Sequence, residues 1–302
     1  MNNEVKGVVA VIAIVALVGN MLTVVLFIKK SKWLRKAHGC LIFALAIQDI
    51  LTAICLLSLP SFVLDHDAYP LPSSPKARYI FCSLVWSQYF PFALGVTSVY
   101  TCLMLIIERW FPLVKPLYYR RYNHSTAVVA ALVLIPWVAG FFFEIATALN
   151  AKPIEQTDGT FICGWKKVES STIERIPVAV FTFLGLFFIP AVIMVVAYVH
   201  IILHMKRSRV RAAGVTTSSA GLNALKQVTI TAFFASTIIV VCWLPDQLYY
   251  ALSLVEITQP GSTAHSALQL LAFANSCINP FIYSFSNREY RNGLKEMFSV
   301  WC

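Results

Sequence analysis

The chain has 302 residues, of which 58% are hydrophobic and 13% are charged, and its mean hydropathy is +0.71. Soluble domains contain about 45–50% apolar and about 25% charged residues. The composition excludes an ordinary water-soluble enzyme, because the polar residues are too few to cover even one domain of this length. Lys and Arg number 24 against 14 Asp and Glu, which gives a net charge of +10. We expect a membrane protein whose basic residues contact anionic lipid headgroups, with no nucleic acid as partner.

Seven apolar stretches are each long enough to cross a bilayer as a helix. The hydrocarbon core is about 30 Å thick, so a helical span needs about 20 residues. Only helices and closed barrels satisfy the backbone in lipid, and these stretches are too long and too continuously apolar for barrel strands. The sequence therefore predicts an all-α membrane protein in which residues 1–302 form a single seven-helix bundle. The predicted spans are residues 7–28, 39–64, 79–107, 126–149, 176–203, 228–254 and 264–285.

The distribution of basic residues predicts the orientation of the bundle. Of the Lys and Arg residues, 17 follow the first, third, fifth and seventh spans, and seven belong to the opposite side. Cytoplasmic loops carry the excess of Lys and Arg. We therefore expect a multi-pass plasma-membrane protein with its amino terminus outside and its carboxyl terminus in the cytoplasm. A cleaved signal peptide is not expected, because the first apolar run is too long and is followed by a basic cluster.

Three cysteines lie near the predicted membrane surfaces. Cys82 is near the start of the third span and Cys163 is in the loop between the fourth and fifth spans. Both are on the predicted outer side, where disulfides persist, so we expect a Cys82–Cys163 bond that ties this loop across the mouth of the bundle. Cys302 is on the cytoplasmic side after a short amphipathic segment and is a candidate for palmitoylation. An unmodified thiol is the alternative for Cys302.

Polar residues inside apolar helices are costly and tend to mark function. Asp49 is the only acid in its predicted span, and other polar residues occur at a similar depth in other helices. Those residues are Asn20, Ser98, Asn275, Ser276 and Asn279. Their oxygens are ligands that a hard cation prefers, so we expect a small Na⁺ or water site with Asp49 and Ser98 as ligands. The alternative is a protonated Asp49 held in a structural hydrogen-bond network.

Three further segments combine charge, aromatic rings and proline. Glu108-Arg109-Trp110 places an acid beside a guanidinium at the inner end of the third span. The sixth span contains Cys242-Trp243-Leu244-Pro245 and the seventh contains Asn279-Pro280-Phe281-Ile282-Tyr283. Proline removes a backbone hydrogen bond and kinks a helix. Each of these two spans is therefore expected to be kinked and able to pivot.

In this arrangement the whole chain resembles the rhodopsin-like (class A) G-protein-coupled receptors. The resemblance depends on the collective order of the residues. Beyond the three segments above, it is carried by Gly19-Asn20, Leu45-Ala46 with Asp49, Pro116, Trp137, Pro190 and Tyr198. Residues 287–298 look like the amphipathic eighth helix of that family, with Tyr290 where an aromatic residue is usual. Short substrings around Pro245 and Pro280 look most like neuropeptide receptors of the galanin, somatostatin and allatostatin type.

The resemblance implies a receptor without enzymatic activity that activates a heterotrimeric G protein, and whose inner face can also meet arrestin. Arg109 would engage the G protein, Trp243 would couple the ligand to the sixth helix, and Na⁺ would act as a negative allosteric ion. The inner cavity would be ringed by Arg109, Pro116, Tyr198, Lys226 and Tyr283. The full set implied for G-protein coupling and activation is Glu108, Arg109, Pro116, Tyr198, Pro245, Asn279, Pro280 and Tyr283.

Two departures from the family pattern lead to separate expectations. The family usually places its outer cysteine 25 positions before the triplet arginine, whereas Cys82 and Arg109 are 27 apart. The upper third helix, which contains Pro91, is therefore expected to be bulged or irregular. Leu225 and Lys226 stand where some members carry an acid that pairs with the arginine. We therefore expect no lock between the third and sixth helices, and raised basal activity.

The ligand class follows from what the spans contain. The seventh span has no lysine for a retinal Schiff base, and residues 82–107 have no acid for a monoamine. Asp246 faces the outer half of the sixth helix amid aromatic residues, which favours a basic or amidated peptide group. Its alternative role is an acid satisfied by a neighbouring helix or by water. The expected ligand-binding residues are Asp246, Gln247, Tyr250, Trp243, Glu144 and Phe273.

Other functions compete with the peptide-receptor hypothesis. A receptor for a lipid or another small molecule is favoured by the aromatic runs 89–92 and 141–143, which also fit lipid-facing anchors. An ion-coupled transporter would use Asp49 and Glu144, but no repeated half supports it. A metalloenzyme would use His200 and His204, which lack a neighbouring Glu and a third ligand. A peptide receptor is the function that the sequence favours.

Overall fold

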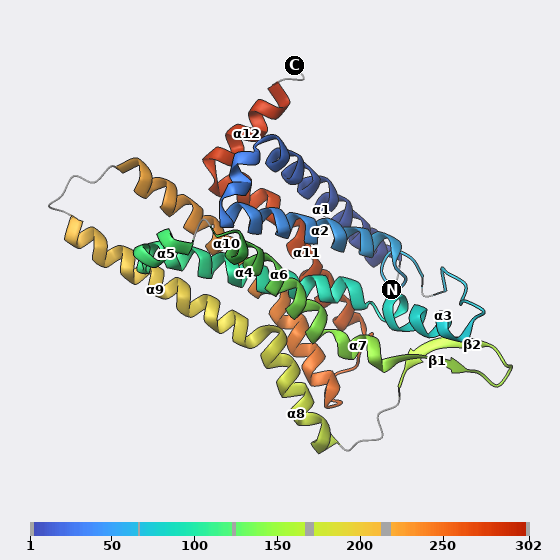
Figure 1. Cartoon of the computed structure of the whole chain (residues 1–302). Coiled ribbons are helices and arrows are strands. Elements are labelled where there is room, and N and C mark those ends of the chain that lie inside the picture. Colours follow the sequence, from blue (N-terminus) through green and yellow to red (C-terminus); the bar gives the residue numbers. More distant parts are fainter. Residues whose placement is uncertain (1–2, 66, 123–124, 167–171, 213–218, 300–302) are drawn as a thin grey trace.

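The structure is a computed structural model that describes residues 3–65, 67–122, 125–166, 172–212 and 219–299. It is a bundle of long helices with one short β-hairpin (Figure 1). The long helices are α1 (Asn3–Lys29), α2 (Ala37–Ser58), α4 (Tyr89–Val114), α6 (Thr126–Phe143), α9 (Ile189–Ala212), α10 (Ser219–Leu254) and α11 (Thr263–Ser286). Shorter segments extend or connect them: η1 (Ser31–Arg35), α3 (Pro75–Ile80), η2 (Phe81–Trp86), α5 (Pro116–Tyr122), α7 (Ile145–Asn150), α8 (Thr172–Phe183), η3 (Leu184–Phe188) and α12 (Arg288–Ser299).

The bundle has two distinct ends, and the two chain termini lie at opposite ends (Figure 1). The hairpin formed by β1 (Ala151–Glu155) and β2 (Phe161–Trp165) lies with α3 at one end, which we call the hairpin end. The amphipathic helix α12 lies at the other, which we call the α12 end. Asp49, Trp243 and Asp246 lie on helices that run between these ends.

Seven helices build the bundle, and six of them, with their short extensions, have the apolar character of a membrane span. Among the residues that the structure describes, six helices are long and apolar enough to cross a membrane. The seventh, α11, has polar side chains that are buried against other helices, including His265, Asn275 and Asn279. Helix α4 is central, because it packs against α2, α6, α9 and α10. The predicted all-α seven-helix fold is confirmed.

The third span is irregular at the hairpin end, as the spacing between Cys82 and Arg109 predicts. The π-helical turn η2 follows α3 directly, and Ser87 donates its backbone N–H to the carbonyl of Cys82 at 3.1 Å. Gln88 then adopts the left-handed region, with φ 63° and ψ 22°, before α4 begins. A π turn holds more residues than an α turn, so this segment accommodates the longer spacing. Pro91 is the third residue of α4, where its missing N–H costs no helical hydrogen bond.

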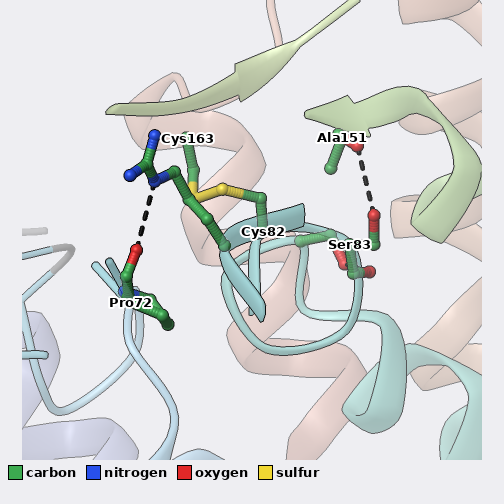
Figure 2. The surroundings of a disulfide bond; sticks show 7 residues. Pro72, Cys82, Ser83, Ala151 and Cys163 are labelled. Atoms are coloured by element: carbon green, nitrogen blue, oxygen red, sulfur yellow. Dashed lines mark hydrogen bonds between the residues drawn. A yellow bond between two sulfur atoms is a disulfide. The ribbon is translucent and has the colours of Figure 1, made fainter. Parts of the chain in front are cut away.

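The expected disulfide between Cys82 and Cys163 is present and fixes the hairpin to the third span (Figure 2). Cys163 lies opposite Pro153 in the antiparallel hairpin, and Cys82 is fully buried. Next to the bond, Ser83 Oγ donates to the carbonyl of Ala151 at 3.3 Å. Residues 82 and 163 are 81 positions apart, so the bond joins distant parts of the chain.

Some helix ends differ from the predicted ones for identifiable reasons. Helix α2 ends at Ser58 instead of residue 64, because Pro60 follows and disfavours the helical region for Leu59 (φ −89°, ψ 151°). The predicted span 126–149 is interrupted at Glu144, between α6 and α7. The predicted span 176–203 is part of the longer α8, η3 and α9, which include a second π-helical segment. Helix α10 begins nine residues before the predicted 228.

The amphipathic helix expected over residues 287–298 is α12, and the structure places it against α1. Tyr290 is buried, and its hydroxyl forms a 2.7 Å hydrogen bond with Thr23 Oγ1. Lys30 and Glu296 form an ion pair at the same junction. Cys302, the palmitoylation candidate, lies outside the described residues.

Candidate functional site

An aromatic cluster lies in the centre of the bundle, towards the hairpin end. The Phe273 ring contacts three other rings: Phe62 at 5.4 Å, Phe92 at 5.5 Å and Trp243 at 5.8 Å between centroids. Trp243 reaches this position because residue 95 is glycine. A Cβ atom at residue 95 would lie 1.9 Å from the Trp243 ring. Two of the predicted ligand-binding residues, Trp243 and Phe273, are thus in direct contact, and Gly95 is a positioning residue that the sequence analysis missed.

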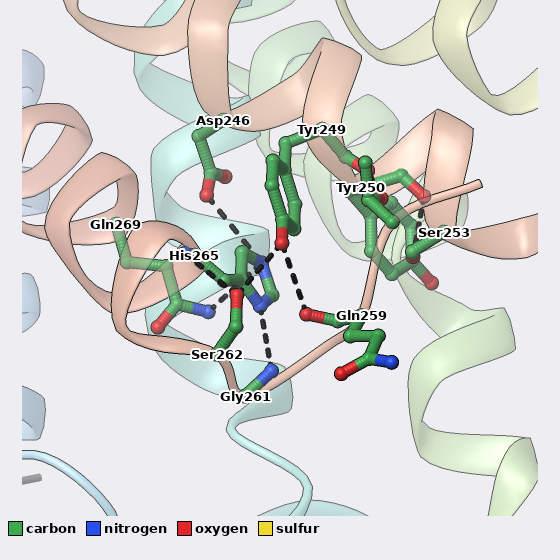
Figure 3. Close-up of polar contacts among 10 residues, drawn as sticks. Asp246, Tyr249, Tyr250, Ser253, Gln259, Gly261, Ser262, His265 and Gln269 are labelled. Atoms are coloured by element: carbon green, nitrogen blue, oxygen red, sulfur yellow. Dashed lines mark hydrogen bonds and ion pairs between the residues drawn. The ribbon is translucent and has the colours of Figure 1, made fainter. Parts of the chain in front are cut away.

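Asp246 lies one turn beyond Trp243 on α10 and is buried, with 1% of its surface exposed. Its Oδ1 is 3.6 Å from Nε2 of His265 on α11 (Figure 3). His265 Nδ1 accepts the backbone N–H of Gly261 at 3.1 Å. In the neutral ring the proton is therefore on Nε2, which faces Asp246. At 3.6 Å this contact is too long for a hydrogen bond, and no other described group bonds to Asp246 Oδ1.

A second layer holds His265 in place (Figure 3). The Tyr249 ring stacks on the imidazole with 5.1 Å between centroids. The Tyr249 hydroxyl forms a 2.7 Å hydrogen bond with Ser262 Oγ and donates to the carbonyl of Gln259 at 3.1 Å. Gln269 Nε2 lies 3.4 Å from His265 Nε2, but because both nitrogens carry hydrogen in this tautomer the contact is not a hydrogen bond. His265 was not predicted as a site residue; its only sequence signal is a lone imidazole at the start of the seventh span.

Three more predicted ligand-binding residues lie near Asp246. Glu144, at the end of α6, is buried and its Oε2 accepts a hydrogen bond from Thr147 Oγ1 at 2.9 Å. Tyr250 is within electrostatic range of both Glu144 and Asp246. Gln247 is buried, and its Oε1 has no hydrogen-bond partner in the described part of the chain. Glu144, Asp246 and Tyr250 therefore bring two acids and a phenol to one region of the hairpin end.

The polar residues in the middle of the bundle form a buried network. Asn279 Nδ2 donates to Asp49 Oδ2 at 2.8 Å. Asn20 Nδ2 donates to the carbonyls of Ala16 and Ser276, each at 2.9 Å. Four side-chain oxygens in this region have no hydrogen-bond partner among the residues described: Asp49 Oδ1, Asn20 Oδ1, Asn275 Oδ1 and Asn279 Oδ1. Unbonded buried oxygens are costly, and these fit a hard cation or an ordered water.

Ser98, the predicted sodium ligand, bonds to Gln48, a residue that was not predicted. Its hydroxyl donates to the Leu94 carbonyl at 3.1 Å and to Gln48 Oε1 at 3.3 Å. Gln48 is fully buried and donates to Thr101 Oγ1 at 2.9 Å. Because Gln48 precedes Asp49, it links the acid's helix to α4. Gln48 was not among the predicted site residues.

At the α12 end, Arg109 is held by its own neighbour. Arg109 Nε donates to Glu108 Oε2 at 2.5 Å, and the two residues form a buried ion pair. Tyr119, on α5, donates its hydroxyl to Glu108 Oε1 at 3.1 Å. Burial, together with the negative charge of Glu108, raises the pKa of Tyr119 to about 12, so the hydroxyl keeps its proton near neutral pH. Pro116 is the first residue of α5, the helix that contains Tyr119.

Of the other residues predicted for activation, Tyr283 and Tyr198 lie towards the same end. Tyr283 is buried, its ring lies 5.8 Å from that of Tyr290, and no described group bonds to its hydroxyl. A cavity of about 10 Å³ separates Arg109, Thr231 and Tyr283. Tyr198 stacks on Phe233 of α10 with 3.9 Å between centroids. Pro245 and Pro280 lie inside α10 and α11, as predicted.

One unpredicted contact joins the third and fifth spans. Trp110 Nε1 donates to His200 Nδ1 at 2.8 Å. It gives His200 a structural role on α9, in place of the metal-ligand role considered for His200 and His204. The side chains of Leu225 and Lys226 lie outside the described residues.

Comparisons with known proteins agree with this geometry. The family described as 7 transmembrane receptor (rhodopsin family) matches residues 19–283. The chain is 24% identical to somatostatin receptor type 1 of Rattus norvegicus over 291 residues, covering 95% of this chain and 70% of the relative. It is 27% identical to the allatostatin-A receptor of Bombyx mori over 292 residues (95% and 77%), and 24% identical to the histamine H2 receptor of Homo sapiens over 298 residues (96% and 78%).

Family membership decides between the broad functional classes. The match covers the segments that carry the triplet, the two proline motifs and the buried polar network. The chain is a non-enzymatic signalling receptor rather than a transporter, and signalling through G proteins is a general property of its family. The chain belongs to the rhodopsin-like, class A, G-protein-coupled receptors.

Proposed function

We propose that the chain is a peptide receptor, with Asp246 as the anchor for a basic or amidated group of the ligand. The observation that carries the proposal is that Asp246 is buried at the hairpin end and its Oδ1 lacks a hydrogen bond within the described residues. A buried charge needs a partner, and the 3.6 Å contact with His265 supplies a weak one. A cationic or N–H donor group of the ligand would supply the missing partner of the Asp246 carboxylate. The relatives named for somatostatin and allatostatin-A support a peptide ligand.

A small-molecule or lipid ligand is the second candidate. It is favoured by the aromatic rings of the buried Phe62, Trp243 and Phe273 and the partly buried Phe92, which would form an apolar pocket floor. One relative is named for histamine. However, residues 82–107 of this chain contain no acid to pair with an amine, which argues against a monoamine.

The proposed orientation places the hairpin end outside the cell and the α12 end in the cytoplasm, at the plasma membrane. It is supported by the excess of basic residues in the segments at the α12 end. On the cytoplasmic side, palmitoylation of Cys302 would hold α12 at the membrane.

The proposed mechanism links the two ends through α10. The ligand acts only through its higher affinity for one conformation. That conformation would have the cytoplasmic half of α10 displaced outward, with Trp243 and Pro245 as its pivot. Arg109 would then leave Glu108 and contact the carboxyl-terminal helix of a G-protein α subunit. That helix would bind between Tyr198 and Tyr283. Arrestin would use the same opening.

Sodium is proposed as a negative allosteric ion in the middle of the bundle. The support comes from the buried oxygens of Asp49, Asn20, Asn275 and Asn279 that have no hydrogen-bond partner among the described residues. Carboxylate and amide oxygens suit a hard cation. Ser98 would join as a ligand by turning its hydroxyl away from Gln48. Sodium binding would favour the compact conformation and oppose agonist binding.

A G-protein activation assay tests the peptide proposal. Cells that express the chain are challenged with amidated and basic peptides and with a lipid panel. We expect a peptide response whose potency falls by at least about 30-fold in Asp246→Asn, because truncating one partner of a buried charge pair costs about 2–5 kcal/mol. Asp158→Asn is the matched control, since Asp158 lies exposed in the hairpin turn.

Two outcomes would contradict the proposal. Responses to lipids but not to any peptide would favour the second candidate. Equal potency loss in Asp246→Asn and Asp158→Asn would remove Asp246 as the anchor. Surface expression of each variant is measured in the same cells, so that loss of folded receptor is not counted as loss of affinity.

A further inference from the structure

A separate cavity of about 230 Å³ lies near the α12 end, away from both the ligand site and the sodium network. Four segments form it: α2, α4, α5 and α6. Its apolar wall includes Ala37, Ile107, Phe111, Tyr118, Val129 and Leu132. An apolar cavity of this size does not hold water well, and leaving it empty forfeits dispersion contacts with the wall. The cavity therefore favours an apolar occupant.

The surroundings of the cavity indicate where that occupant comes from. The cavity is partly open, and large apolar residues beside it are exposed, including Leu117 (79%), Tyr118 (61%) and Phe111 (40%). In a membrane-embedded bundle, such surface faces lipid rather than water. Because α5 follows the third span at its α12 end, an acyl chain from the adjacent leaflet can reach the opening.

A cation lies beside the opening. Lys115 Nζ lies 5.8 Å from the centre of the Tyr118 ring, and Tyr118 lines the cavity. Lys115 is exposed and connects α4 to α5. A lysine at the membrane surface attracts anionic headgroups. An apolar cavity with a lysine beside it matches the two parts of an anionic phospholipid.

The same cavity touches the pair that restrains Arg109. Glu108 and Tyr119 are both part of its lining, and the Tyr119 hydroxyl donates to the Glu108 carboxylate that binds Arg109. An occupant would press on Tyr119 and keep its hydroxyl on Glu108. A ligand stabilises the conformation in which its pocket exists, here the conformation with Arg109 paired.

We propose that this cavity is a regulatory lipid site, which binds one acyl chain of an anionic phospholipid of the cytoplasmic leaflet and places its headgroup at Lys115. Binding holds Tyr119 on Glu108 and Glu108 on Arg109, and so lowers basal signalling. The site requires no ligand at the hairpin end and is independent of which ligand the receptor binds there.

Photolabelling tests the site directly. The full chain is reconstituted in phosphatidylcholine nanodiscs that contain phosphatidylserine with a diazirine on one acyl chain, and labelled peptides are mapped by mass spectrometry. We expect the label to concentrate on residues 107–132, compared with the ends of the other helices. Uniform labelling of all lipid-facing segments would overturn the proposal. The experiment uses the unaltered chain, so its outcome does not depend on whether a variant folds.

Two matched variants localise the binding. Leu132→Trp fills the cavity, whereas Leu134→Trp makes the same change on the outer surface of α6, where Leu134 is 59% exposed. We expect Leu132→Trp to reduce labelling of residues 107–132 at least about fivefold, with no change in Leu134→Trp. Equal labelling in the two variants would overturn the site.

Headgroup and function are tested in the same nanodiscs. Lys115→Gln should reduce labelling by phosphatidylserine but not by a phosphatidylcholine probe, while Lys29→Gln at the end of α1 leaves both unchanged. Phosphatidylserine should lower ligand-free nucleotide exchange on a G protein about fivefold in the parent and in Leu134→Trp, but not in Leu132→Trp. The proposal would be contradicted if Lys115→Gln had the same effect on labelling by both probes. It would also be contradicted if phosphatidylserine raised ligand-free nucleotide exchange.

Discussion

Each end of the receptor has a buried acid, and the two acids differ in how completely they are hydrogen-bonded. Glu108, at the α12 end, receives hydrogen bonds from Arg109 at 2.5 Å and from Tyr119 at 3.1 Å. Asp246, at the hairpin end, has His265 at 3.6 Å and an oxygen without a hydrogen bond in the described structure. A buried carboxylate whose oxygens are all hydrogen-bonded stabilises the conformation that makes those bonds. A buried carboxylate with an unbonded oxygen can still accept a bond from a ligand. The difference supports our proposals that the acid at the α12 end restrains the receptor and that the acid at the hairpin end binds the ligand.

Glu108→Gln should give the largest change at the inner end. The substitution removes the charge that holds Arg109, and breaking a buried pair costs several kcal/mol. Ligand-free signalling of the unaltered chain is expected above an empty-vector control, and the variant should raise it at least about tenfold. Nucleotide exchange on a purified G protein measures the effect. Glu296→Gln, which breaks the exposed pair with Lys30, serves as the control. Unchanged basal exchange in Glu108→Gln would refute the proposal that Glu108 restrains the receptor through Arg109.

Asp49→Asn should have the next largest effect, on the link between the two ends. We expect Na⁺ to weaken agonist binding about fivefold in the parent and to have no effect in the variant, because the amide lacks the charge that a cation needs. Agonist competition at high and low NaCl, with choline chloride to keep the ionic strength constant, measures this. Insensitivity of the parent to Na⁺ would refute the ion site and favour a structural network around Asp49.

Tyr119→Phe should act like Glu108→Gln but more weakly. It removes one hydrogen bond to Glu108 and leaves the ion pair with Arg109 in place. The net contribution of a typical hydrogen bond is about 0.5–1.5 kcal/mol, so ligand-free exchange should rise between about twofold and tenfold. Because the pKa of Tyr119 is raised to about 12, the difference between parent and variant should stay constant from pH 6 to 9. Any stability due to this shift is complete below pH 10 and lost as the pH rises towards 12. A difference that disappears between pH 6 and 9 would contradict the hydrogen bond.

Tyr249→Phe should have the smallest effect, on stability alone. The hydroxyl joins α10 to the loop before α11 through Ser262 and Gln259. Its loss should cost about 0.5–1.5 kcal/mol and lower the thermal midpoint, while the retained ring still stacks on His265. Agonist potency should be unchanged. A potency loss as large as that of Asp246→Asn would make Tyr249 part of the ligand anchor.

Much of this architecture could be predicted from the sequence, because the signals are local. The apolar stretches identify the spans, since a span needs a minimum length of apolar residues. The spacing from Cys82 to Arg109 predicts an irregular third span, and the structure shows the π turn and the left-handed Gln88 that make it so. The boundary of α2 was misplaced, although Pro60 signals it.

The residues that complete each site could not be predicted, because they come from elsewhere in the chain. His265 pairs with Asp246 from another helix, and Tyr119 reaches Glu108 from the following helix, α5. Gly95 matters because it leaves room for the Trp243 ring. None of the three stands out in its own segment, because a lone histidine, tyrosine or glycine has many ordinary roles.

The sequence by itself determined the membrane class, the seven spans, the family motifs and the cysteines of the disulfide, because hydropathy and motif spacing are properties of short segments. Tertiary structure alone decided that Arg109 is paired with Glu108, that Asp246 is left with an unbonded oxygen, and that a cavity lies behind Tyr119. Such features depend on distances between helices, which packing fixes only when the whole bundle has assembled.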